Sequence, residues 1–388
     1  MLTWPTESAV VMGMKSLLVF LTLAGSAQTH TDVMPQAAVA EASAPARWSE
    51  REFMMPVRGA MQGIDVLQVE VERPGKHPLA ILTHGTAAER ADRATVTPWL
   101  FLPQAIWFAR RGYVVLVVVR KGYGRSSGDQ DGKFGGCQPG GRGSFVEAGE
   151  DSAEDLRAAA KYAEEKLPEV DAGTVVSAGV STGGFAQVAL TADRPPGLKA
   201  AISFAGGRGG DGKEHNCDFG GIVSAFQHFG KKSRIPMLWI YSENDHWFPP
   251  AMAQKFDEAF RAGGGTDQFV MAPPYRDDGH GYYYDVAGWT PVVEDFLRGH
   301  DLLPLTNLLP APPVPDVAPP AGLTDRGQAA FRTFLIMGPS KAFATNGAEG
   351  WGMSFGQYDQ GIADKKAMEN CTRNVHGQGR CSVVARTK

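Results

Sequence analysis

Residues 179–183 read Gly-Val-Ser-Thr-Gly, directly after the apolar stretch 174–178 and just before the helix-compatible stretch 185–192. A buried strand that ends in Gly-x-Ser-x-Gly and turns into a helix is the layout of a nucleophile elbow. Glycines suit this turn because side chains there would collide with neighbouring backbone. The turn exposes the Ser181 hydroxyl and points the Thr182 N–H toward a developing oxyanion. The alternative is a glycine-rich turn with an ordinary serine, and the partners of Ser181 decide between the two.

A serine nucleophile needs a histidine base that is oriented by a carboxylate, and in this layout both follow the serine along the chain. The stretch 237–241 predicts a strand, and the loop after it carries Asp245. An acid just past a strand end lies at the catalytic edge of a parallel sheet. We predict Asp245 as the acid, with Glu243, closer to the strand, as the alternative. A purely structural role for Asp245 would be a helix N-cap or an Asx turn.

The histidine base is predicted at His280. It follows the short strand predicted at 268–271 and stands between two glycines, which allow the backbone to bring an imidazole close to a reacting centre. His246 is closer to the acid in sequence but precedes that last strand. We therefore prefer His280.

Two further motifs complete a pattern that extends along most of the chain. The stretch 79–86 is an apolar strand ending in His-Gly-Thr, and 120–128 reads Arg-Lys-Gly-Tyr-Gly-Arg-Ser-Ser-Gly. Together with the elbow, Asp245 and His280, in this order, they resemble the α/β-hydrolase superfamily. The resemblance is to its branch of dienelactone-hydrolase-like and dipeptidyl-peptidase-like esterases and peptidases. It implies an α/β fold with a mainly parallel, doubly wound sheet.

The resemblance also implies an oxyanion hole formed by the backbone N–H groups of Thr86 and Thr182, with His84 supporting the loop. The chain departs from dienelactone hydrolases, which use a cysteine nucleophile, because it has Ser181 at that position. No propeller or jelly-roll partner domain of the oligopeptidase kind is visible. Ester hydrolysis is therefore favoured over peptide hydrolysis.

Composition and charge argue against a nucleic-acid-binding function. The chain has 388 residues and a formal net charge of −4, without a basic block, so we expect no nucleic-acid partner. We also predict no metal and no cofactor. The expected partner is a small-molecule ester or a short peptide.

The N-terminus predicts export. Residues 1–27 are predicted as a signal peptide, with a positive region at Met14-Lys15-Ser16, an apolar core at 17–24 and small residues at 25–27. The apolar core is too short to span a bilayer, so no stable membrane anchor is expected after cleavage. The alternative is an uncleaved anchor or a buried N-terminal helix. We predict a periplasmic or secreted protein.

Four cysteines in an exported chain favour disulfides over a metal site, and Cys-x-x-Cys is absent. Three connectivities are open. We prefer Cys137–Cys217, which would join two loops on the catalytic side, and Cys371–Cys381, which would close a small C-terminal loop.

The organisation along the chain follows from alternating strand and helix patterns. We predict a flexible segment at 28–47 and a hydrolase domain at 48–300, which begins with an antiparallel edge hairpin that turns near Arg58-Gly59 or Gln62-Gly63. The hydrolase domain contains a cap insertion at 206–232, for which an irregular surface loop is the alternative. Prolines at 304, 310, 312, 313, 315, 319 and 320 predict a linker at 301–325.

Residues 326–388 are predicted as a small α+β module of strand–strand–helix–strand type, with its helix at 362–371 and one disulfide. It resembles the small domains appended to bacterial periplasmic proteins, and we interpret it as a binding or packing module. Near the acid and the base, Trp247, Phe248 and Tyr282 are candidates for a substrate pocket, with simple packing as the alternative.

The leading hypothesis is thus an exported serine hydrolase that cleaves a carboxylic ester. A peptidase or amidase acting on short peptides, and a catalytically silent hydrolase fold acting as a binding protein, are the alternatives.

Overall fold

The structure is a computed structural model that describes residues 47–87, 90–129, 144–375 and 379–387. The predicted signal peptide and Cys137 lie outside the described residues, so the predicted Cys137–Cys217 pairing stays a prediction. Among the described residues, no helix combines the length and the hydropathy that a bilayer crossing requires.

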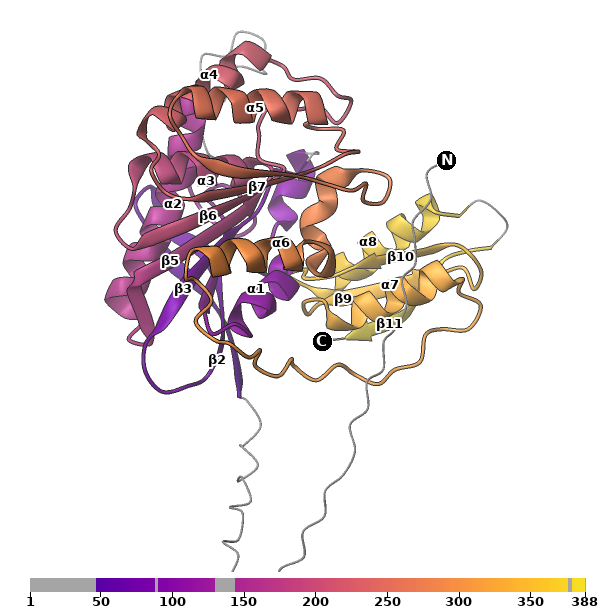
Figure 1. Cartoon of the computed structure of the whole chain (residues 1–388). Coiled ribbons are helices and arrows are strands. Elements are labelled where there is room, and N and C mark those ends of the chain that lie inside the picture. The colour runs from indigo at the N-terminus through magenta and orange to yellow at the C-terminus, as the bar shows by residue number, and fades with distance from the viewer. Residues whose placement is uncertain (1–46, 88–89, 130–143, 376–378, 388) are drawn as a thin grey trace, which may run out of the picture. The chain divides into compact units, whose positions relative to one another are not determined.

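An eight-stranded sheet forms the centre of the larger part of the chain (Figure 1). Its strand order is β1-β2-β4-β3-β5-β6-β7-β8, in which β1 and β2 are antiparallel and the strands from β4 onward run parallel. This is the topology of an α/β-hydrolase fold, and the predicted mainly parallel sheet is confirmed. The strands are β1 (Trp48–Val57), β2 (Ala60–Val71), β3 (His77–Thr83), β4 (Val114–Val118), β5 (Val170–Val180), β6 (Leu198–Phe204), β7 (Met237–Ser242) and β8 (Asp267–Ala272).

Helices cover both faces of this sheet. In β3, Leu79 and Ile81 face one hydrophobic cluster, whereas Ala80 and Leu82 face the other, as the alternation of side chains along a strand requires. The first cluster is closed by α2 (Phe145–Lys166), α3 (Thr182–Asp193), α4 (Phe219–Lys232) and α5 (Pro250–Ala262). The second is closed by the 3-10 turn η2 (Pro98–Phe101), α1 (Leu102–Ala109) and α6 (Val286–Gly299).

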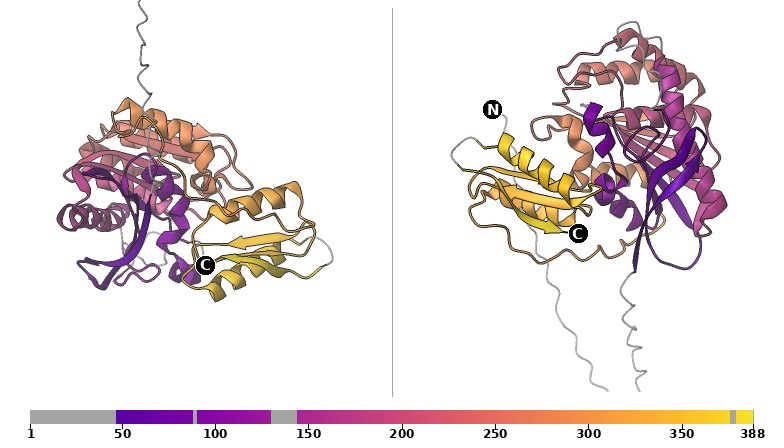
Figure 2. Two further views of the ribbon diagram at one scale, coloured as in Figure 1. Left: turned by 90° about the horizontal axis from the view of Figure 1, so that it is seen from below. Right: turned by 180° about the vertical axis from the view of Figure 1, so that it is seen from behind.

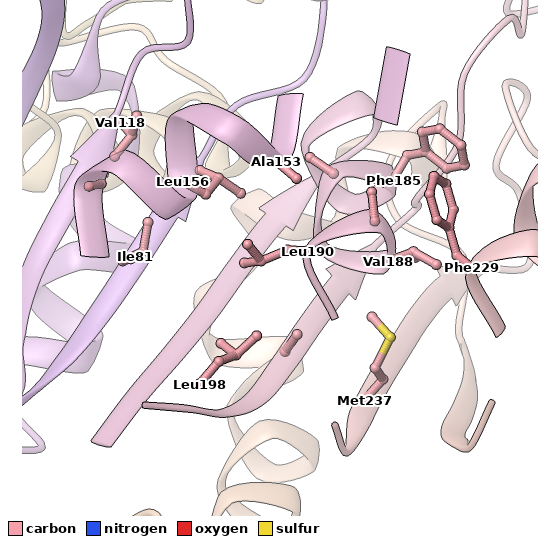
Figure 3. Close-up of a cluster of buried hydrophobic side chains, with 14 of the residues drawn as sticks. Ile81, Val118, Ala153, Leu156, Phe185, Val188, Leu190, Leu198, Phe229 and Met237 are labelled. Atoms are coloured by element: carbon pink, nitrogen blue, oxygen red, sulfur yellow. The ribbon is translucent and has the colours of Figure 1, made fainter. Parts of the chain in front are cut away.

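The first cluster shows why the parallel strands are apolar along their whole length. Figure 3 shows Leu156 of α2 and Val188 of α3 above strands that carry Ile81, Leu198 and Met237. Strands buried on both faces read as continuous apolar runs, as in β4, where all five residues are buried.

The N-terminal hairpin turns at Arg58-Gly59, the first of the two predicted positions, and pairs Val57 with Ala60. Gly63 marks an irregularity in the register rather than the turn. Its φ is +81°, and a Cβ there would lie 2.5 Å from the carbonyl oxygen of Met55. A glycine is therefore needed where the two strands approach.

The predicted cap insertion needs correction in its helical half. Residues 219–232 form α4, and the rings of Phe226 and Phe229 pack against Phe185 inside the first cluster. Apolar residues spaced by three or four positions put one face of this helix onto the domain core. The irregular half, 206–218, lies next to the acid loop, since Glu214 N donates to the carbonyl oxygen of His246.

The C-terminal module has an antiparallel sheet of its own, in the order β10-β9-β11. Figure 2 shows its strands between two helices from two further sides. Phe343 of the central strand packs against α7, whereas Ala342 and Ala344 pack against α8. Its elements are α7 (Asp325–Ile336), β9 (Lys341–Thr345), β10 (Trp351–Ser354), α8 (Gln360–Arg373) and β11 (Ser382–Thr387).

The predicted Cys371–Cys381 disulfide is confirmed and joins the last turn of α8 to the start of β11. The sequence pattern predicted the strands and α8, but not α7. Within the module, the ammonium of Lys341 donates to the carbonyl oxygens of Leu335 and Met337, at the C-terminal end of α7. Burial lowers the pKa of Lys341 to about 8.

Candidate active site

Ser181 stands on a strained turn between the last residue of β5 and the first of α3. Its φ is 57° and its ψ −121°, a backbone conformation that L-residues seldom adopt. A Cβ on Gly179 would lie 2.4 Å from the carbonyl oxygen of Gly183, and one on Gly183 would lie 2.4 Å from that of His84. The two glycines of the motif are therefore required by close backbone packing, as the sequence predicted.

Asp245 lies just beyond β7 and its side chain is fully buried. Its Oδ1 accepts hydrogen bonds from the backbone N–H groups of Trp247, at 2.8 Å, and Phe248, at 2.9 Å. Asp245 therefore has the structural turn role that we considered as an alternative, and it also contacts His280. Glu243, the alternative acid, is exposed.

The imidazole of His280 faces this carboxylate. His280 Nδ1 lies 3.1 Å from both Oδ1 and Oδ2 of Asp245. A carboxylate only accepts, so Nδ1 carries a proton, and in the neutral imidazole Nε2 then has the lone pair of a general base. His246, the other candidate, points instead to the exposed Glu214, with 3.3 Å between Nδ1 and Oε1.

Ser181 and His280 are linked by packing, and these two described residues share no direct hydrogen bond. Gly207 N donates to the carbonyl oxygen of Ser181 at 3.1 Å, and a Cβ on Gly207 would lie 2.6 Å from the ring of Phe248. The Phe248 ring in turn lies 5.5 Å from the imidazole, between centroids. Hydrogen bonds between nucleophile and base are often long until substrate binds. The catalytic roles of Ser181, Asp245 and His280 stay predictions.

Asp278 ties the loop that carries Asp245 (the acid loop) to the loop that carries His280 (the base loop). The sequence analysis missed this residue. Its Oδ1 accepts from the backbone N–H of His280 at 2.9 Å and from that of His246 at 3.2 Å. His246 directly follows Asp245, so one carboxylate fixes the backbone beside both members of the pair. An acidic residue two positions before a candidate base is the sequence signal that could have indicated this N-cap.

Asn244 holds the same two loops from the other side. Its side-chain oxygen accepts from Tyr275 N at 2.9 Å, and its side-chain nitrogen donates to the carbonyl oxygen of Arg276 at 3.1 Å. Gly279 N donates to the Asn244 carbonyl at 3.0 Å. The approach leaves no room for a side chain at Gly279, where a Cβ would lie 2.4 Å from Asn244 Oδ1.

Thr86 and Thr182, the predicted oxyanion donors, lie side by side. Their hydroxyl oxygens are 3.0 Å apart, and the Thr86 hydroxyl also contacts the hydroxyl of Tyr123 at 2.7 Å. Arg120 donates to the Thr182 hydroxyl at 3.0 Å. The side chains thus form a polar chain that fixes the two backbone segments relative to each other. The role of their N–H groups as an oxyanion hole stays a prediction.

His84 supports this arrangement, as the resemblance implied. Arg120 N donates to His84 Nε2 at 3.0 Å, which leaves the proton on Nδ1 to donate to the Gly85 carbonyl at 2.7 Å. The imidazole is buried and packs edge-to-face against the ring of Tyr123, with 4.7 Å between centroids. His84 therefore belongs to the scaffold of the loop.

A buried tyrosine fixes the loop behind the nucleophile. Burial raises the pKa of Tyr241 well above its ordinary value, and the charge of Asp245 raises this pKa further. Its hydroxyl therefore stays neutral and donates to the Gly206 carbonyl at 2.5 Å. This hydrogen bond holds the segment that donates to Ser181.

The three candidate pocket residues have different surroundings. Trp247 lies roughly parallel to the imidazole of His280, with 5.4 Å between centroids and 30° between planes. Phe248 is buried against His280, and Tyr282 packs edge-on against Tyr275. Packing accounts for these contacts, and pocket lining stays a prediction. Within the part of the chain that the structure describes, no group of three or more His, Cys, Asp or Glu residues could hold a metal ion.

Comparison with known families places the elbow inside a recognised segment. Residues 62–231 match the X-Pro dipeptidyl-peptidase (S15) family, a range that includes β3, the Arg120 loop and Ser181. Asp245 and His280 lie beyond the matched range. No curated protein matches the chain in sequence.

Solved structures resemble about two thirds of the chain. A Klebsiella pneumoniae subsp. pneumoniae protein named as a dienelactone hydrolase is 17% identical, with a TM-score of 0.44, over 65% of this chain and 99% of its own. A thermophilic esterase from Thermogutta terrifontis is 17% identical, with a TM-score of 0.46, over 66% of this chain and 96% of its own. A puromycin-hydrolyzing peptidase from Mycobacterium tuberculosis is 16% identical, with a TM-score of 0.45, over 67% of this chain and 40% of its own. These likenesses do not bear on the substrate.

Proposed function

We propose that this chain, which has an α/β-hydrolase fold and matches the X-Pro dipeptidyl-peptidase (S15) family over residues 62–231, cleaves carboxylic esters through a Ser-His-Asp triad and an acyl-enzyme intermediate. Ser181 is the nucleophile, His280 the base and Asp245 the acid. The observation that carries the proposal is the pairing of His280 Nδ1 with the buried Asp245 carboxylate. This pairing leaves Nε2 in the protonation state that a base requires.

In the proposed reaction, the Ser181 oxygen attacks the ester carbonyl carbon while His280 Nε2 takes the hydroxyl proton. The oxyanion that forms accepts hydrogen bonds from the N–H groups of Thr86 and Thr182, the latter at the N-terminus of α3. The imidazolium then returns its proton to the leaving alcohol, and an acyl group remains on Ser181. Water, activated by the same base, releases the acid.

The position of Asp245 supports its role in this reaction. With its side chain fully buried, it holds the imidazole by contacts to both carboxylate oxygens, and it stabilises the imidazolium that forms in each half of the reaction. Backbone hydrogen bonds from Trp247 and Phe248 keep the carboxylate in place. No proton needs to leave the imidazole toward Asp245.

A fluorophosphonate probe tests the proposal. We expect the wild type to be labelled and to hydrolyse p-nitrophenyl acetate, and Ser181→Ala to lose both activities while it keeps its near-ultraviolet circular dichroism. Ser177→Ala is the matched control, because that serine lies on the same strand, is fully buried, and donates to the Ile81 carbonyl. A wild type that is not labelled would instead support the catalytically silent binding protein.

Peptide hydrolysis is the second candidate, favoured by the match of residues 62–231 to a family of X-Pro dipeptidyl-peptidases. The test is a panel that compares p-nitrophenyl esters with p-nitroanilides of single amino acids and of Xaa-Pro dipeptides. A higher kcat/KM for the Xaa-Pro anilides than for the esters would reverse our order of preference.

We also propose that the protein acts in the periplasm or outside the cell. The disulfide between Cys371 and Cys381 supports an oxidising compartment. The predicted signal peptide agrees with this proposal. Fractionation of cells that express the full chain, followed by mass spectrometry of the mature N-terminus, tests export and the cleavage site together.

A further inference from the structure

We propose that the C-terminal module is a positioning element for the oxyanion hole, with Tyr358 as its anchor in the hydrolase domain. The proposal rests on the proposed function and gives a role to a module that carries no triad residue. Two sets of contacts support it: those of Tyr358 itself, and those between the module and the segment that follows Thr86.

The hydroxyl of Tyr358 is inserted among backbone and side-chain groups of the hydrolase domain. It lies 2.8 Å from Asp65 Oδ2 and 3.0 Å from the Val96 carbonyl, and it accepts from Arg125 N at 3.1 Å. The guanidinium of Arg125 covers the ring at 4.0 Å from its centroid. The tyrosine thus uses its hydroxyl and its ring face in one contact.

The hydrolase domain has a glycine where this hydroxyl enters. The φ of Gly124 is +55°, and a Cβ there would lie 2.4 Å from the Tyr358 hydroxyl and 2.1 Å from the Val96 carbonyl oxygen. A side chain at this position would exclude the tyrosine. The site therefore accommodates Tyr358 closely.

The hydroxyl of Tyr358 has one hydrogen, and it donates this hydrogen to Asp65 Oδ2 and to the Val96 carbonyl oxygen. The charged groups that face Asp65 are Glu52 and Arg125. Burial, and secondarily Glu52, raises the pKa of Asp65 to about 7, whereas the hydrogen bond from Tyr358 lowers this pKa.

The module also holds the segment that follows Thr86. Thr97 donates to the carbonyl of Gly356. Lys366 donates to the Thr95 hydroxyl at 2.6 Å and lies 3.5 Å from Asp92. A Cβ on Gly356, whose φ is +61°, would lie 2.8 Å from the backbone of Leu100.

These contacts lie on the two segments that build the oxyanion side of the site. Gly124 N donates to the Arg93 carbonyl at 2.9 Å, so the two segments are tied to each other. Tyr123, next to Gly124, contacts the Thr86 hydroxyl, and Arg120, on the same loop, donates to Thr182. The path from the module to the predicted oxyanion donors therefore consists of adjacent residues and direct hydrogen bonds.

The test uses the full-length chain with Tyr358→Phe, which removes the hydroxyl and keeps the ring. One buried hydrogen bond changes an equilibrium by about tenfold. We therefore expect about tenfold faster hydrogen exchange of the backbone amides in 120–126, and about tenfold lower kcat for p-nitrophenyl acetate with KM unchanged. Tyr162→Phe is the matched control, because this tyrosine lies on α2 and stacks on Phe53.

A second variant perturbs the same contact from the module side. Gly356→Ala places a methyl group against Trp99 and Leu100, and we expect it to raise exchange in 92–101 as well and to lower kcat in parallel. Unchanged exchange and kcat in Tyr358→Phe would overturn the proposal. A drop in kcat without any change in exchange would overturn it too. Hydrogen exchange can be measured on a protein without activity. A wild type that does not hydrolyse the ester would show that the proposed function is wrong, whereas unchanged exchange in Tyr358→Phe would show that the positioning role is wrong.

Discussion

Replacing Asp278 by alanine should reduce turnover without removing any group that we expect to touch substrate. One oxygen of this carboxylate accepts from the backbone beside the acid, at His246 N, and from the backbone of the base, at His280 N. A hydrogen bond to a charged group contributes about 1.5–3 kcal/mol, and partial exposure of Asp278 favours the lower value. Only the part of that energy that holds the imidazole in its productive orientation reaches the transition state.

We therefore expect the activation free energy to increase by about 1.5–2 kcal/mol, which is a drop of roughly 10- to 30-fold in kcat. KM should stay the same, because the loss of an interaction that matters mainly in the transition state lowers kcat alone. The assay is hydrolysis of p-nitrophenyl acetate over a range of substrate concentrations. Asp278→Asn keeps an acceptor oxygen for both N–H groups and should retain most of the activity.

Asp277 provides the matched control. Its side chain is 97% exposed and lies 4.0 Å from the side chain of Arg326, which is also exposed, so Asp277→Ala should leave kcat unchanged. A kcat for Asp278→Ala within twofold of that for Asp277→Ala would refute the argument that this carboxylate holds the acid and base loops together.

Two further predictions concern stability. Because the pKa of Asp65 is raised from 3.8 to about 7, the folded protein binds a proton that the unfolded chain releases. The free energy of unfolding should therefore decrease as the pH rises from about 4 to about 7, by at most about 1.4 kcal/mol per pH unit. Asp65→Asn should flatten this slope in urea unfolding, and equal slopes would contradict the raised pKa of Asp65. The Cys371–Cys381 disulfide has a sequence separation of 10, and replacing both cysteines by serine should cost about 3 kcal/mol. Unfolding of the double variant in urea measures this, and a midpoint equal to that of the wild type would contradict it.

The sequence was most informative where a residue's role follows from its place along one strand or turn. The apolar runs that become β3, β4 and β5 are buried on both faces, so their composition alone predicts central parallel strands. The elbow glycines are dictated by local backbone packing around Ser181. These constraints are short in range, and a sequence pattern records them directly.

The sequence was less informative where a role depends on contacts between distant segments. The sequence analysis predicted 206–232 as a cap insertion or a surface loop, whereas Phe226 packs against α3 and α5 in the domain core. Asp278 and Asn244 are ordinary loop residues until the two loops meet. The order of Asp245 and His280 along the chain predicted their pairing, but their hydrogen-bond geometry depends on those neighbours.

The contact between Tyr358 and Asp65 joins residues 293 positions apart and has a consequence for biosynthesis. A ribosome adds about 5–20 residues each second, so Asp65 is polymerised roughly 15–60 seconds before the tyrosine that covers it. A nascent chain that has passed residue 280 already has the proposed nucleophile, acid and base, yet it lacks the residue that we propose holds the oxyanion segments. Translation order would thus delay maturation of the hydrolase until the C-terminal module has been made.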